Sequence, residues 1–243
     1  MAASDGLRAQ VKARLTLVRT RRGARLLHGR HVLSEILAEP GATRSVFDLL
    51  AAAAFVLAPP GPLGMLGFAA GGVIAPLRAL GSVAKVSAVD LSLEGAPIFW
   101  ELSKRWAGQV RLWEGEASRW LLRRRERFSC IIEDLSEQLP GDVSKPAVSL
   151  GPLPAIIARR LTRDGVVVIN GLPVPGWHWT QVQRALTAPY FGVVQLSPDG
   201  YENKILVGGR HLPPPRMLRQ QLVVALEQLG SPLARGLGVR RLR

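Results

Sequence analysis

From residue 63 onward, short apolar runs rich in β-branched residues alternate with longer segments that can form helices. Strands are expected over seven of these runs, at residues 63–68, 85–90, 110–113, 128–132, 165–170, 191–196 and 204–208. Helices are expected between the first six, at residues 72–80, 93–106, 116–125, 152–161 and 177–188. The last two runs are too close together for a crossover and should pair antiparallel. The pattern predicts an α/β fold with a mostly parallel seven-stranded sheet, helices on both faces and a C-terminal antiparallel hairpin.

The turn after the first expected strand reads Gly67-Phe-Ala-Ala-Gly-Gly72, and the next strand ends in Asp90. Glycines allow a turn to approach a ligand closely, and the helix that follows is expected to present free N–H groups to it. Asp90 is placed to accept hydrogen bonds from two ribose hydroxyls. Because Ala69 occupies the middle position of a Gly-x-Gly-x-Gly turn, an adenosine-type nucleotide is favoured over a dinucleotide. The alternative is an ordinary tight turn between a strand and a helix.

Upstream of this region, apolar and polar residues alternate at residues 13–20 and 24–37, which predicts a hairpin or a small sheet. A helix is expected over residues 45–57, with Ser45 as its N-cap. A proline run precedes a final amphipathic helix around residues 217–229. The predicted units are a basic N-terminal β-hairpin region, a nucleotide-binding domain and a basic C-terminal extension with a helix, at residues 1–44, 45–209 and 210–243.

Composition excludes several classes of protein. With 243 residues and 47% hydrophobic content, the chain can bury a substantial core and is not disordered. The single cysteine, Cys130, excludes an intramolecular disulfide and a cysteine metal cluster, and the histidines are too isolated to predict a metal site. The charge-free span 49–77 is cut by prolines, so no membrane span is expected. Because no secretory signal precedes it, the expected location is the cytoplasm.

The net charge of +14 is concentrated at the two ends of the chain. Residues 1–30 and 210–243 contribute +7 and +6, while the middle of the chain is nearly neutral. Such ends can contact nucleic acid or another anionic surface weakly through counterion release. They are equally the solvated arginines of an arginine-rich protein, and no nucleic-acid-binding motif accompanies them.

Together these segments resemble class I S-adenosylmethionine-dependent methyltransferases. They resemble more narrowly the spermidine synthase (polyamine aminopropyltransferase) branch, which has this Rossmann-like fold after a small N-terminal β-domain. Five motifs carry the resemblance, which extends over residues 12–209: the Gly67 turn, Asp90, Gly115-Glu116-Ala117, Asp134-Leu-Ser-Glu137 and the closing segment 201–207.

The resemblance implies a role for each matched residue. Gly67, Ala69 and Gly71 would hold the tail of the nucleotide, while Asp90 would hold the ribose. Glu116 and Ala117 would contact the adenine edge. At the mouth of the fourth strand, Asp134 would orient and deprotonate an attacking amine, and Glu137 would add a second anionic contact. The implied cosubstrate is S-adenosylmethionine or its decarboxylated form, and the implied reaction is methyl or aminopropyl transfer to an amine-type acceptor, without a metal.

Two departures from the family pattern weaken the case for a polyamine acceptor. Ala70 stands where spermidine synthases have an aspartate, and Val32 stands where they have a glutamine. A polyamine is a chain of cations that requires a line of carboxylates. A divergent transferase is therefore the favoured interpretation. The alternatives are a non-catalytic interaction module and a nucleic-acid-associated protein, and a homodimer is considered as a further assembly.

Overall fold

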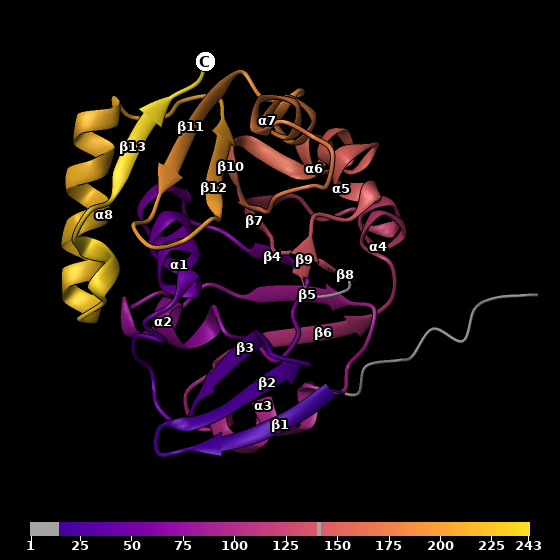
Figure 1. Cartoon of the computed structure of the whole chain (residues 1–243), viewed down its shortest axis with the longest axis vertical. Helices are drawn as coiled ribbons and strands as arrows, with labels where there is room; N and C mark the ends of the chain where they lie inside the picture. The colour runs from indigo at the N-terminus through magenta and orange to yellow at the C-terminus, as the bar shows by residue number, and fades with distance from the viewer. Residues whose placement is uncertain (1–14, 140–141) are drawn as a thin grey trace, which may run out of the picture.

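The computed structural model describes residues 15–139 and 142–243. The remaining residues include part of the predicted basic N-terminal region, which therefore lies outside the described residues. A central eight-stranded sheet has the order β13-β11-β12-β10-β7-β4-β5-β6 (Figure 1). Its strands are β4 (Leu63–Leu66), β5 (Val86–Asp90), β6 (Val110–Glu114), β7 (Phe128–Glu133), β10 (Leu161–Gly171), β11 (Gly192–Ser197), β12 (Lys204–Gly209) and β13 (Gly238–Arg241).

Strands β6, β5, β4, β7 and β10 run parallel, and β12, β11 and β13 add antiparallel to them. The mostly parallel sheet with its terminal hairpin is thus confirmed. The sheet has one strand more than expected, because residues 238–241 pair with β11. Their sequence, Gly-Val-Arg-Arg, lacks an apolar run, and a strand at the sheet edge can carry charged residues toward solvent.

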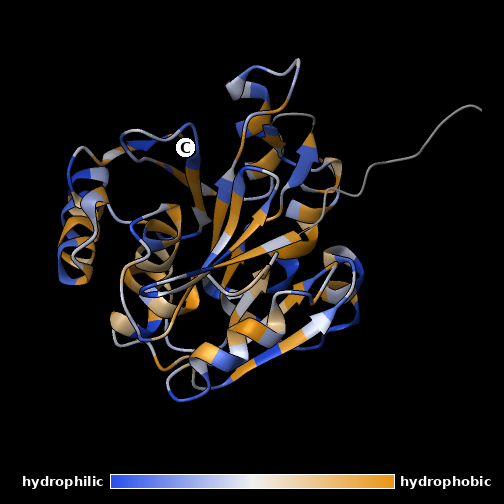
Figure 2. Ribbon diagram, turned by 60° about the horizontal axis from the view of Figure 1, so that its bottom comes forward, coloured by the Kyte–Doolittle hydropathy of each residue, from blue (hydrophilic) through white to orange (hydrophobic). Residues whose placement is uncertain are grey.

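Helices cover both faces of the sheet. One face carries α1 (Val46–Leu57), α2 (Ile74–Ala79), α3 (Ala96–Ser103) and α8 (Pro215–Leu229). The other carries α4 (Ala117–Arg123), α5 (Ala147–Leu150), α6 (Leu153–Arg160) and α7 (Trp179–Thr187). Side chains alternate between the two cores along each strand, so Met65 packs on the first face and Leu66 on the second. Figure 2 shows the resulting apolar strands between the helical layers.

The chain begins with a small antiparallel sheet of β1 (Leu15–Thr20), β2 (Gly23–His28) and β3 (His31–Leu37), as the alternating pattern predicts. This sheet packs beside α3 (Figure 1), where Arg19 forms an ion pair with Glu101 at 2.8 Å. A second hairpin, β8 (Glu137–Leu139) and β9 (Asp142–Ser144), follows β7. A short 3₁₀ helix, η1 (Pro232–Ala234), precedes β13.

Helix α1 is buried along most of its length, because it lies between the sheet and α8. Ser45 is its N-cap residue, but its hydroxyl lies 2.9 Å from the Thr43 hydroxyl and makes no capping bond to the helix. Asp48 in the first turn instead accepts hydrogen bonds from the backbone N–H groups of Thr43 and Arg44. These bonds fix the loop that enters the helix. Among the described helices, none is both long and apolar enough to cross a membrane.

Candidate functional site

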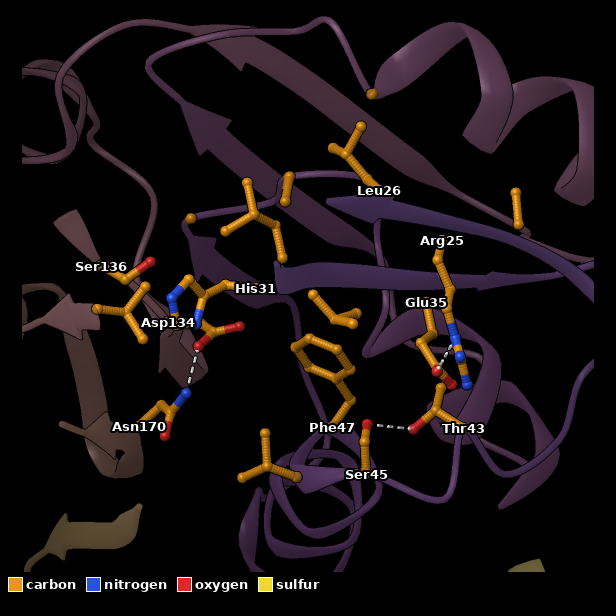
Figure 3. A pocket seen from close by; sticks show the side chains of 18 of the residues that line it. Arg25, Leu26, His31, Glu35, Thr43, Ser45, Phe47, Asp134, Ser136 and Asn170 are labelled. Atoms are coloured by element: carbon orange, nitrogen blue, oxygen red, sulfur yellow. Dashed lines mark hydrogen bonds and ion pairs between the residues drawn. The ribbon is translucent and has the colours of Figure 1, made fainter. Parts of the chain in front are cut away.

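A cavity of about 1000 Å³ lies at the carboxyl ends of the central strands, between them and the small N-terminal sheet. Four of the residues singled out in the sequence line it: Gly67, Ala69, Asp90 and Asp134. Figure 3 shows Asp134 on the sheet side of this cavity and Arg25 and Glu35 on the side of the small sheet. The structure thus brings these four predicted residues together at one cavity.

The turn after β4 is held against the end of β7. Gly67 has a φ of +83°, and a Cβ at this position would lie 2.5 Å from the carbonyl oxygen of Asp134. Ala69 has a φ of +48°, an unfavourable conformation for a residue with a side chain. Its carbonyl oxygen lies so close to Gly95 that a Cβ there would be 2.2 Å away. Close backbone packing thus places Asp134 beside the turn.

This packing predicts that Gly67→Ala destabilises the fold by about 2 kcal/mol, because the added methyl group meets both an unfavourable φ and backbone atoms. The matched control is Gly200→Ala, where φ is +74° and nothing lies within 4 Å of the added Cβ. That variant should lose only about 1 kcal/mol. Urea denaturation measures both, and equal losses would show that the contact with Asp134 contributes nothing.

Asp90, the last residue of β5, is bonded to the glycine-rich turn. Its Oδ2 accepts hydrogen bonds of 2.7 Å from the backbone N–H groups of Phe68 and Ala69, and its Oδ1 accepts one of 3.2 Å from Ser92 N. Gly72 N donates to Ser34 Oγ on β3 at 2.9 Å. The expectation that the predicted helix over residues 72–80 presents free N–H groups is therefore wrong at its first residue, Gly72. Oδ1 retains acceptor capacity at the cavity wall.

Asp134 follows directly after β7 and is bonded to Asn170, which is itself bonded to Asn203. Asn170, near the end of β10, donates from Nδ2 to Asp134 Oδ1 at 2.7 Å (Figure 3). Asn203 in turn donates to Asn170 Oδ1 at 2.9 Å. The pKa of Asp134 is raised to about 7, chiefly by desolvation and also by the nearby carboxylates Glu133 and Asp90, against the lowering effects of Asn170 and Lys145. A carboxyl group with this pKa can take up a proton near neutral pH.

Behind Asp134, on the opposite face of β7, lies a buried ion pair. Glu133 Oε2 is 2.7 Å from Lys145 Nζ, and the two side chains are 2% and 0% exposed. Lys145 also donates to the carbonyl oxygen of Leu135 at 2.8 Å, and Ser149 Oγ donates to Glu133 Oε1 at 2.9 Å. Adjacent strand residues point to opposite faces, which is why Glu133 faces the helices and Asp134 the cavity. The pair anchors the segment that carries Asp134.

Four other predicted site residues do not line the cavity. Glu116 is the N-cap of α4, where its carboxylate accepts hydrogen bonds from the backbone N–H groups of Ser118 and Arg119 at 2.7 and 2.8 Å. Desolvation opposes these bonds, but they prevail and lower the pKa of Glu116. The other three are a buried residue of α4, a glycine packed against Phe68 and Phe99, and an exposed residue of β8: Ala117, Gly71 and Glu137.

The small-sheet side of the cavity was not anticipated from the sequence. Its charged residues are mostly basic, namely Arg21, Arg22, Arg25 and Arg44 beside Glu35, and His31 lines it as well. The His31 Nε2 is buried and has no hydrogen-bond partner among the described residues. The sequence signal for this side of the cavity was the alternation in residues 24–37. Alternation shows which side chains share a face of the sheet, but it does not show what that face lies against. In the part of the chain that the structure describes, no cluster of three or more His, Cys, Asp or Glu side chains could hold a metal ion.

No protein-family model and no curated protein matches this chain in sequence. Solved structures do match. Human methyltransferase-like protein 13 in complex with SAH has a TM-score of 0.56 at 16% identity, over 77% of this chain and 90% of that one. A spermidine synthase in complex with the transition-state analogue AdoDATO scores 0.60 at 11% identity, over 89% and 83%. The Thermotoga maritima spermidine synthase scores 0.59 at 12% identity, over the same shares.

The chain has the class I S-adenosylmethionine-dependent methyltransferase fold. The small sheet in front of the central sheet agrees with the spermidine synthase-like branch of that fold. In this methyltransferase fold the strand order reverses beside β4, with β5 and β6 on one side and β7 and β10 on the other. Open α/β sheets bind ligands at such a switch point. Gly67 and Asp134 meet there, which makes the cavity the candidate functional site.

Proposed function

We propose that this protein is an S-adenosylmethionine-dependent transferase whose acceptor is deprotonated by Asp134. The observation that carries the proposal is the position of this carboxyl group, with a pKa of about 7, in the same cavity as Asp90 and the Gly67 turn. Support comes from neighbours with the same fold whose structures contain SAH or AdoDATO.

In this proposal the cosubstrate lies along the sheet side of the cavity. Asp90 Oδ1 accepts hydrogen bonds from the ribose, while Oδ2 continues to hold Phe68 N and Ala69 N. Gly67 lets the turn lie against the backbone of Asp134, because any side chain there would collide with it. The proposed adenine contact of Glu116 requires its carboxylate to bind the ligand while it caps α4.

A bound sulfonium cosubstrate supplies an electrophilic carbon and leaves as a neutral thioether. The chain's own residues have to orient the acceptor, exclude water and take its proton. Asn170 holds Oδ1 of Asp134, so the carboxylate can receive the proton as the new bond forms. Methyl transfer is favoured over aminopropyl transfer because Ala70 is fully buried and outside the cavity lining, so the turn offers no carboxylate to a cationic tail.

The test is calorimetry with S-adenosylmethionine, its decarboxylated form and methylthioadenosine. In Asp90→Asn, one side-chain oxygen remains to accept the hydrogen bonds from the turn, but the second acceptor becomes an NH2 donor. Binding of all three compounds should therefore weaken by about 10- to 100-fold. Asp164→Asn, at an exposed position outside the cavity, is the matched control and should bind like the wild type. Glu116→Gln in the same series tests the adenine contact.

Two outcomes would contradict the proposal. One is the absence of binding by all three compounds, which would favour the non-catalytic alternative. The other is equal weakening in Asp90→Asn and Asp164→Asn, which would place the ligand elsewhere. A preference for the decarboxylated form would assign aminopropyl rather than methyl transfer.

A further inference from the structure

The sheet-side wall of the cavity carries negative charge, and the opposite wall carries an excess of positive charge. The two carboxylates at the sheet side, Asp90 and Asp134, stand at the ends of β5 and β7. The opposite wall consists of β2, β3, the turn before β2 and the loop before α1. That wall contributes one carboxylate, Glu35, and four arginines: Arg21, Arg22, Arg25 and Arg44.

The single carboxylate of the small-sheet wall is already neutralised. Glu35 Oε1 lies 2.6 Å from Arg25 Nε, as Figure 3 shows. Arg22 donates to the carbonyl oxygen of Ala42, a neutral partner. Arg21 and Arg44 have no side-chain hydrogen bond or ion pair to any residue that the structure describes. This wall therefore retains an excess of positive charge, and two of its guanidinium groups are available to a ligand.

Apolar side chains also line the cavity, and Phe47 lies between Asp134 and the Arg25–Glu35 pair in Figure 3. Leu26 and Val32 line the cavity as well, and Val32 offers no hydrogen bond where spermidine synthases have a glutamine. A ligand that fills the cavity thus meets a proton acceptor at one end, an apolar middle and guanidinium groups at the other end.

We infer that the acceptor is a small molecule with an amine or hydroxyl nucleophile at one end and an oxyanion, a carboxylate or phosphate, at the other. This inference rests on the proposed transferase function. The nucleophile lies at Asp134, and the oxyanion lies at Arg21 and Arg44, since guanidinium groups match the geometry of both oxyanions. A polyamine would place its distal ammonium group against these arginines, and like charges in a partly enclosed site repel strongly.

The test uses acceptor pairs that differ only in the charge of the distal group. The protein is first saturated with methylthioadenosine, and binding of α,ω-diamines is then compared by calorimetry with binding of ω-amino acids of the same length, from four to six carbons. The amino acid should bind at least about 10-fold more tightly than its diamine at one or more lengths, as expected for one charge-assisted contact.

Arg21→Gln with Arg44→Gln should abolish this preference, whereas Arg216→Gln, at an exposed position on α8, should retain it. Both cavity arginines are exposed, so the fold should tolerate the changes, and thermal unfolding checks this. A stronger affinity for the diamine, no preference at any length, or a preference that survives the double variant would each overturn the inference. Failure of S-adenosylmethionine, its decarboxylated form and methylthioadenosine all to bind is a separate result, which removes the transferase proposal and this inference with it.

Discussion

Asp134→Asn lowers kcat by about 100- to 10 000-fold, the range that loss of a positioned general base produces. Asparagine keeps the shape of the side chain and an oxygen that can accept the hydrogen bond from Asn170, but it cannot take up the proton. Calorimetry should therefore find the dissociation constant of the cosubstrate unchanged. Glu137→Gln is the matched comparison, because this carboxylate is exposed and outside the cavity lining. A small effect of Asp134→Asn together with a large effect of Glu137→Gln would assign the base to Glu137.

The pH dependence follows from the same carboxyl group. Only ionised Asp134 can accept a proton, so kcat of the wild type should rise with pH and level off above about 7. Folding stability should change in the opposite direction. Because the folded-state pKa of about 7 lies above the ordinary value of 3.8, the folded state binds more protons between these values, and wild-type stability falls as pH rises through this window. Asp134→Asn should lack both trends. A flat rate profile for the wild type would contradict the role of Asp134.

Lys145→Met destabilises the protein by about 3–5 kcal/mol, because it leaves Glu133 charged and buried without its partner. Methionine occupies a similar volume, so the loss reports the charge more than the packing. The carbonyl oxygen of Leu135 loses its donor at the same time. Since Leu135 follows Asp134 at the cavity, we also expect weaker cosubstrate binding.

The double variant Glu133→Gln with Lys145→Met separates these effects. It removes both charges and leaves Ser149 a side-chain oxygen to bond, so most of the lost stability should return. Urea denaturation at neutral pH measures Lys145→Met, Glu133→Gln and the double variant in one cycle. If Lys145→Met costs less than about 1 kcal/mol, or if the double variant is no more stable than the single one, the buried pair does not hold this segment.

Much of the fold could be predicted because local patterns carry it. The apolar runs set the strands of the central sheet, and the short connection between the last two runs set their antiparallel pairing. Glu133 and Asp134 face opposite sides of the sheet, as adjacent residues of a strand do, so this arrangement also follows from local structure. The edge strand at residues 238–241 was not predicted, because two arginines interrupt its apolar pattern and its pairing depends on a strand that is distant in the sequence.

The candidate site was only partly predictable for the same physical reason. The Gly67 turn and Asp90 follow from spacing along the chain, because parallel strands bring their carboxyl ends to one edge. Spacing could not show that Asp90 bonds the turn itself or that Glu116 caps a helix, because both depend on which backbone N–H groups fold back within reach.

The sequence by itself thus determined the sheet, its two helical layers and the edge at which Asp90 and Asp134 would lie, since each of these follows from the periodicity of apolar residues and the direction of the strands. Only the tertiary structure decided what faces them. The small sheet and the loop before α1 pack across the cavity and bring Arg21 and Arg44 to the wall opposite the carboxylates. Both the raised pKa of Asp134 and the charge of the facing wall arise from burial and proximity, which no local pattern specifies.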